Sequence, residues 1–141
     1  MDVAELMPVA TINKKGLMPT YNARLTINND TDTSKIYKVC DINNDFHAFL
    51  ELSVSHPTAT PSLVYVKISR HNSQNQELKG VKNKIIGDID VYIDKSNNYL
   101  AVKLIPYERL SIRFMVGYNV IFNVSELSDE NGLIALTDKL Q

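Results

Sequence analysis

From Lys35 onward, apolar and polar residues alternate in short runs that are separated by turn-forming residues. The clearest run extends from Phe46 to Val54, where apolar side chains occupy every second position and only Phe49 interrupts the polar set. A period of two places one side of an extended strand in a core and the other in water. Pro57 and Pro61 mark a loop, because proline is not tolerated inside a central strand. The alternation therefore predicts a chain built from strands.

The same pattern predicts the other strands, and no amphipathic stretch of helical length separates them, so crossover helices and a parallel sheet are not expected. The expected strands are residues 36–42, 46–54, 64–68, 85–93, 100–104, 110–116 and 120–124, and residues 133–136 are a short last strand or a tail. The polar stretch 71–84 is expected to be the longest loop, and residues 94–98 a hairpin connection. Seven or eight short strands at this spacing indicate an all-β fold, an antiparallel β-sandwich of jelly-roll-like character over residues 35–141.

Composition limits the class of protein further. A chain of 141 residues suggests one domain, or one domain with a short appendage. The formal charge of -1 gives no reason to expect a nucleic-acid partner. No apolar run is long enough to span a bilayer, and the N-terminus shows no secretory signal peptide, so membrane insertion and secretion are not expected. Cys40 is the only cysteine, which excludes an internal disulfide.

Residues 1–34 differ in composition from the rest and are interpreted as an N-terminal stalk or oligomerisation segment followed by a polar loop or linker over 28–34. The segment contains too few apolar residues for a core of its own, so a copy of the same chain is their simplest partner. Gly16 permits a tight turn within it. The expected oligomerisation residues are Leu6, Met7, Val9, Ile12, Gly16, Leu17 and Met18. The alternative is that this segment folds back onto its own sandwich as an edge strand.

Residues 10–25 resemble a short element of tail-fibre and baseplate proteins from tailed phages and prophages. The matching residues are Ala10, Thr11, Gly16, Leu17, Met18 and Leu25. In that family the element lies in a slender stalk where three chains wrap around a shared apolar axis, and a turn of helix follows the Gly-Leu-Met. Here Thr20 is the candidate cap for such a helix, which would begin at Tyr21.

Residues 35–137 resemble, by their order of strands, the small β-sandwich domains at the distal ends of phage neck appendages and tail fibres. The resemblance is carried by Lys35-Ile36-Tyr37-Lys38-Val39 and by the Pro106-Tyr107 step before the strand Ser111-Ile112-Arg113-Phe114. Cys40 and Asp41 stand where the family usually has small residues.

These resemblances imply a non-enzymatic virion component, the structural or receptor-binding part of a phage or prophage tail fibre or baseplate appendage. Its expected partners are itself as a homotrimer, other virion proteins, and a saccharide or protein of the host cell surface during adsorption. Its expected location is the virion tail, after assembly in the bacterial cytoplasm. The alternative is a bacterial carbohydrate-binding or adhesion module of non-viral origin, and a small hydrolase on a sandwich scaffold is least favoured.

No residue pattern points to catalysis or to a cofactor. His47, His56 and His71 show no metal-ligand spacing, and no Gly-x-Ser-x-Gly elbow marks a nucleophile. Cys40 is interpreted as a buried structural thiol, because it lies among apolar residues in a predicted strand. No catalytic residue, metal or cofactor is therefore expected.

Asp88, Asp90 and Asp94 fall on one face if residues 85–93 continue as a single strand. Three carboxylates on one face suit a calcium ion, but the spacing is not that of an EF-hand loop. The alternative is a solvated face paired across strands with Lys103 or Lys67.

Tyrosines are the remaining feature, with seven in a chain that has no tryptophan. A tyrosine ring offers a flat apolar body with a hydroxyl handle, which suits saccharide or protein recognition. The expected ligand-binding residues are Tyr65, Tyr92, Tyr99, Tyr107 and Tyr118. Ordinary sandwich surface and packing between subunits stay open as alternatives for them.

Overall fold

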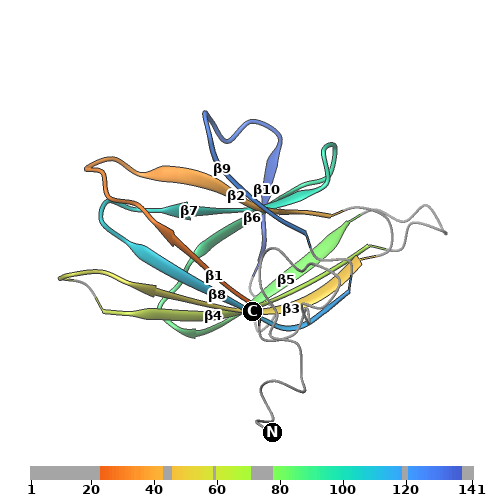
Figure 1. The fold of residues 1–141 in the computed structure, drawn as a ribbon, viewed down its shortest axis with the longest axis horizontal. Coiled ribbons are helices and arrows are strands. Elements are labelled where there is room, and N and C mark those ends of the chain that lie inside the picture. The colour runs from red at the N-terminus through yellow and green to blue at the C-terminus, as the bar shows by residue number, and fades with distance from the viewer. Residues whose placement is uncertain (1–22, 43–45, 59, 71–77, 119–120, 138–141) are drawn as a thin grey trace, which may run out of the picture.

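The computed structural model describes residues 23–42, 46–58, 60–70, 78–118 and 121–137, and these form two five-stranded antiparallel sheets packed face to face (Figure 1). Sheet A has the strand order β1-β8-β3-β4-β5, and sheet B has the order β10-β6-β7-β2-β9. The strands are β1 (Ala23–Asn28), β2 (Lys35–Asp41), β3 (Phe46–Ser55), β4 (Ser62–Arg70), β5 (Lys79–Ile86), β6 (Asp90–Asp94), β7 (Tyr99–Leu104), β8 (Arg109–Tyr118), β9 (Ile121–Leu127) and β10 (Leu133–Ala135). The predicted all-β sandwich is confirmed.

The jelly-roll-like character lies in how the chain passes between the layers. β2 pairs with β9 in sheet B, while β3 pairs with β8 in sheet A. Along the chain the second pair lies inside the first, and the two pairs belong to opposite sheets. Within this nested arrangement, β6 and β7 form a hairpin in sheet B. The meander β3-β4-β5 keeps three consecutive strands in sheet A, which distinguishes this fold from a regular eight-stranded jelly roll.

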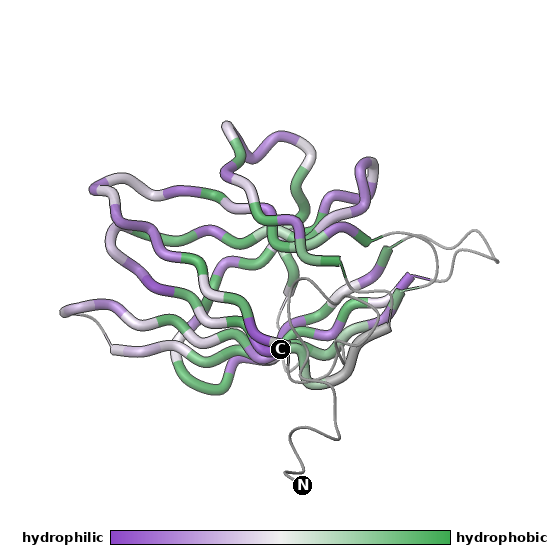
Figure 2. Tube along the Cα trace, in the orientation of Figure 1, coloured by the Kyte–Doolittle hydropathy of each residue, from purple (hydrophilic) through white to green (hydrophobic). Residues whose placement is uncertain are grey.

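The core lies between the sheets and follows the alternation of the sequence. In β3 every second residue from Phe46 to Val54 is buried, and hydrophobic and hydrophilic residues alternate along the strands in Figure 2. Phe114 of β8 is fully buried, and its ring meets that of Phe122 from β9 edge to face at a centroid distance of 4.9 Å. This pair links the two sheets across the core.

The start of the sandwich differs from the prediction. Residues 23–28, expected in the stalk and its short helix, form strand β1, which pairs along its whole length with β8 at the edge of sheet A. Ile27 is buried in the core and Leu25 packs against it, so this strand uses the same alternation as the others. Placing the start of the sandwich at residue 35 was therefore wrong, and the edge-strand alternative holds for residues 23–28. The oligomerisation residues between Leu6 and Met18 lie outside the described residues.

The polar stretch 28–34, interpreted as a loop or linker, is a loop within the sandwich that connects β1 to β2. Asn29 is fully buried, and its side-chain amide donates hydrogen bonds to the carbonyl oxygens of Thr33, Leu104 and Ile105 at 2.9–3.1 Å. Its side-chain oxygen accepts hydrogen bonds from the backbone amide and hydroxyl of Thr31. The Asn29 side chain thus connects the β1–β2 loop to the end of β7. Its amide supplies hydrogen bonds that the carbonyl oxygens there would otherwise lack.

The apolar run 85–93, predicted as one strand, is divided between two sheets. Gly87 has a φ of 63°, and a Cβ atom there would collide with the Ser62 Oγ atom, so only glycine fits the bend without displacing its neighbour. The chain leaves β5 of sheet A at Ile86 and enters β6 of sheet B at Asp90. β5 itself begins at Lys79, inside the stretch predicted as a long loop.

The segment after β10 closes one open side of the sandwich. The backbone amide of Leu136 donates to the carbonyl of Val91 in sheet B, and the amide of Lys82 in sheet A donates to the carbonyl of Thr137. The Leu136 side chain is buried and lies directly over Gly80. This side is therefore covered, which removes part of an exposed strand edge. In the described part of the chain, no helix has the length and hydropathy needed to cross a membrane.

Candidate binding surfaces

The structure separates the five predicted tyrosines. Tyr65 lies on the outer face of sheet A, whereas Tyr92 and Tyr99 lie on the outer face of sheet B. Tyr107 is half exposed in the β7–β8 turn, with a φ of 64°. The side chain of Tyr118 is outside the described set. Tyr65, Tyr92 and Tyr99 point away from the core as expected, but the four tyrosines whose side chains are described do not converge on a single site.

On sheet B, Tyr92 and Tyr99 border an ordered hairpin. Asp94 is buried, and its carboxylate accepts hydrogen bonds from the backbone amides of Ser96 and Asn97 at 2.9 and 2.8 Å. Burial by itself raises the pKa of Asp94, but the hydrogen bonds from Asn97, Ser96 and the Tyr99 hydroxyl together lower it. Burial and the Asp94 charge raise the pKa of Tyr99. These groups hold the β6–β7 turn and are already engaged.

The cations of the outer face of sheet B are paired. Lys38 lies 2.8 Å from the Asp41 carboxylate and 5.5 Å from the centre of the Tyr99 ring. Lys103 contacts Glu130 at 2.8 Å. Lys35, which the register places on the opposite side of the sheet at the start of β2, contacts Glu126 at 3.4 Å. The lysines of this face are thus engaged in ion pairs within the protein, so few unpaired positive charges remain for a ligand.

The outer face of sheet A carries an exposed aromatic pair. Phe49 on β3 is 39% exposed, and its ring lies 6.1 Å from that of Tyr65 on β4, with an angle of 47° between the planes. Val81 on β5, the second neighbour of Phe49 across the strands, is 36% exposed. An open hollow of about 190 Å³ adjoins Phe49 and is lined by His47, Ala48, Phe49, Lys67 and Ile68. The sequence feature that indicates this surface is Phe49, an aromatic residue on the polar side of its strand. The predicted binding residues did not include it.

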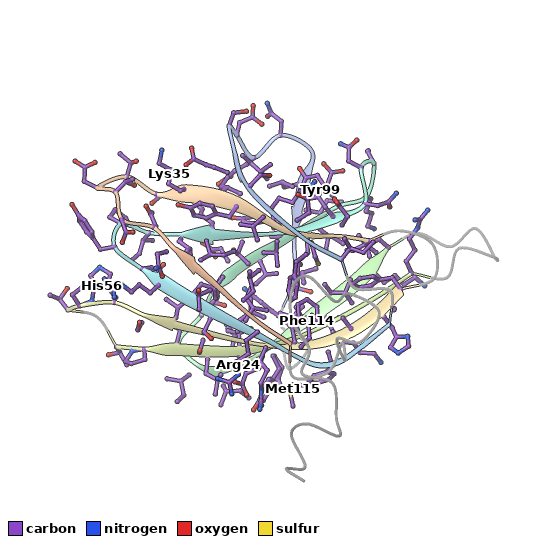
Figure 3. All side chains as sticks on the ribbon, in the orientation of Figure 1. Arg24, Lys35, His56, Tyr99, Phe114 and Met115 are labelled. Carbon is purple, nitrogen blue, oxygen red and sulfur yellow. The ribbon has the colours of Figure 1, made fainter. Side chains whose placement is uncertain are left out.

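The charges on this face differ from those on sheet B. Glu51 is paired with Arg113 at 2.8 Å. Arg24, Lys67, Lys79 and Arg109 are exposed, and within the described ranges none of them forms an ion pair. Arg24 and Met115 project from sheet A on the side that faces away from sheet B, while Phe114 lies between the sheets (Figure 3). The outer face of sheet A thus combines aromatic rings with unpaired positive charge.

The three aspartates do not form one cluster: Asp90 and Asp94 lie on the same face of β6, whereas Asp88 precedes that strand. Asp88 lies between β5 and β6, where its carboxylate contacts the Lys82 ammonium at 2.8 Å. Asp90 is exposed opposite Lys103, and Asp94 is buried in the hairpin turn. Among the described residues, no group of three or more histidine, cysteine or acidic side chains is placed to hold a metal ion.

The other candidate reactive residues are dispersed. His47 lies on the outer face of sheet A and His56 follows β3, where its ring contacts Thr58, while His71 falls outside the described residues. Cys40 is fully buried beside a bulge in β2, as predicted for a structural thiol. Burial raises the pKa of Cys40 to about 12.

Cys40 should therefore resist thiol reagents while the protein is folded. A thiol with a pKa of about 12 carries on the order of a thousandfold less thiolate at pH 8 than an ordinary cysteine, and burial also blocks access. We expect no labelling by a disulfide reagent in native buffer and one labelled thiol per chain in urea. Rapid labelling of the native protein would show that this region of β2 opens.

Comparison of the chain with protein-family models, with curated proteins and with solved structures finds no match.

Proposed function

We propose that this chain is a non-enzymatic, trimeric component of a phage or prophage tail fibre or baseplate appendage that contacts a saccharide of the host surface. The observation that carries the proposal is the Gly16-Leu17-Met18 segment, which resembles the stalk element of those proteins and precedes β1 by only a few residues. In such a molecule the N-terminal segment associates three chains, and the sandwich presents its outer faces to the host.

Packing of the sandwich supports this division of roles. The buried apolar residues that fill the interior between the sheets run from Ile27 to Leu136. Leu6, Met7, Val9 and Ile12 belong to a stretch too short to form a core alone. Leaving each large apolar side chain in water forfeits about 1.5–3 kcal/mol, which favours their burial between copies of the chain.

The proposal predicts that the full chain is a trimer in light scattering at micromolar concentration. Leu17→Asp combined with Met18→Asp should shift it to monomer, because charges at a shared apolar axis lack partners. Ile121→Asp with Ile134→Asp is the matched control, since both side chains are about half exposed in the sandwich. That control should remain trimeric.

A monomeric wild-type chain would contradict the fibre assignment. If such a monomer still bound bacterial surface polysaccharides, the alternative of a bacterial carbohydrate-binding or adhesion module would replace it. A monomer that bound none of them would contradict both assignments.

A further inference from the structure

The strand register places the aromatic pair and three cations of sheet A, Lys67, Arg24 and Arg113, in two adjacent rows. Phe49 lies opposite Lys67, which lies opposite Val81. In the next row Arg24 lies opposite Arg113, and Arg113 opposite Glu51. Because neighbouring strands are about 4.8 Å apart, Arg24 on β1 and Lys67 on β4 lie on the order of 15 Å apart. The face is therefore an extended strip in which Lys67 lies between Phe49 and Val81, while Arg24 lies at the β1 edge beyond the Glu51–Arg113 ion pair.

The positive charge on the outer face of sheet A is local to that face and does not follow from the composition of the whole chain. The whole chain has a formal charge of -1, and the three lysines on sheet B have carboxylate partners. On the outer face of sheet A, Arg113 is paired with Glu51, and among the described residues no carboxylate pairs with Arg24 or Lys67. Cations left without partners around an exposed apolar patch favour an anionic ligand, because charge complementarity guides binding.

We propose that the outer face of sheet A binds an acidic polysaccharide, with sugar rings against Phe49 and Tyr65 and carboxylate or phosphate groups near Lys67 and Arg24. This rests on the proposed function, for which it specifies the chemical class of ligand and the face that takes it. A polymer suits the distance between the two cations, since a single sugar cannot reach both.

The geometry of the rings favours a saccharide over a nucleic acid. Single-stranded nucleic acids bind where aromatic side chains offer successive stacking platforms. Phe49 and Tyr65 are tilted by 47° against each other and form one ridge. Such a ridge, with the Tyr65 hydroxyl beside it, suits the apolar face of a sugar with polar groups at its edge.

The test measures binding of the full chain to an oligogalacturonate and to its methyl-esterified, uncharged form by calorimetry. A poly(glycerol phosphate) provides a phosphate-bearing probe. We expect binding to at least one anionic polymer, little or none to the esterified form, and weakening as salt is raised. Lys67→Gln with Arg24→Gln should weaken binding about 5- to 30-fold, as expected for two exposed charge contacts. Phe49→Ala should weaken it independently of salt.

Lys38→Gln with Lys103→Gln is the matched control, since it removes the same charge from the outer face of sheet B. It should change the affinity less than twofold. Equal loss from both double variants would overturn the assignment to sheet A, and tighter binding to single-stranded DNA or to anionic lipid vesicles than to either acidic glycan would overturn the ligand class.

An array of bacterial surface polysaccharides separates this inference from the proposed function. Binding only to neutral glycans by a trimeric chain would overturn the inference and leave the fibre assignment in place. A chain that is monomeric and binds no glycan on the array would contradict the fibre assignment itself.

Discussion

Phe114→Ala is expected to lower the free energy of unfolding by about 3–5 kcal/mol, the range found when a large aromatic side chain is removed from a core. Phe114 is fully buried in β8, and it supplies the edge-to-face contact with Phe122 that joins the two sheets. Alanine would leave a cavity in the interior, and the opposing sheet could collapse into it only in part. Urea unfolding followed by circular dichroism measures the loss directly.

Phe49→Ala is the matched control, because the same substitution is made on an adjacent strand at a side chain that is 39% exposed. It should cost about 1 kcal/mol or less. Phe114→Leu, which keeps most of the volume, should fall between the two. Equal losses at Phe49 and Phe114 would mean that the interior of the sandwich is not packed as the structure has it.

Asp88→Asn is expected to lower the free energy of unfolding by about 1–3 kcal/mol through its effect on Lys82. The Lys82 side chain is only 8% exposed, and its ammonium donates to the Asp88 carboxylate at 2.8 Å and to the Ile89 carbonyl at 3.0 Å. Asparagine keeps an oxygen for the Ile89 amide, so the change removes mainly the negative charge that compensates a buried cation. Asp88 itself is 47% exposed, and water there limits the loss.

Lys82→Met distinguishes the contribution of the Lys82–Asp88 ion pair from that of the packing around the lysine side chain. Methionine fills the space of the lysine stem without a charge, so this variant should stay within about 1 kcal/mol of the wild type. The double variant Lys82→Met with Asp88→Asn should be no less stable than Asp88→Asn alone, giving a coupling of about 1–2 kcal/mol. Strictly additive losses in urea unfolding would show that the ion pair does not stabilise the crossing from β5 to β6.

Much of the fold could be predicted because burial on one side of a strand leaves a period of two in the sequence. The runs around Phe46–Ser55 and Ser62–Arg70 show that period and form strands where expected. Residues 85–93 show the same apolar character but belong to two sheets, since a left-handed bend at Gly87 is a matter of backbone conformation that hydrophobic pattern does not report. Asn29 lies in a stretch interpreted as a loop or linker, and its burial could not be predicted, because the sequence does not distinguish a buried, hydrogen-bonded asparagine from a solvated one.

The candidate surface was predicted only in part. Tyr65 was expected to face outward and does, and Phe49 was noticed as an irregularity on the polar side of its strand. That these two rings touch, and that Lys67 stands beside them without a carboxylate partner among the described residues, depends on the register between β3 and β4. A shift of one residue would have turned either strand over.

The amino-acid sequence by itself determined the all-β class, the positions of most strands and the burial of Cys40, because these follow from local alternation and from the cost of exposing apolar side chains. Tertiary structure decided the rest: that residues 23–28 complete sheet A, that Asp88 neutralises a buried lysine, and that Lys38 and Lys103 of sheet B have carboxylate partners whereas, among the described residues, Arg24 and Lys67 of sheet A have none. The physical reason is that such contacts join residues that are distant in the chain. Which residues become partners depends on the pairing between strands, and no local sequence pattern encodes that pairing.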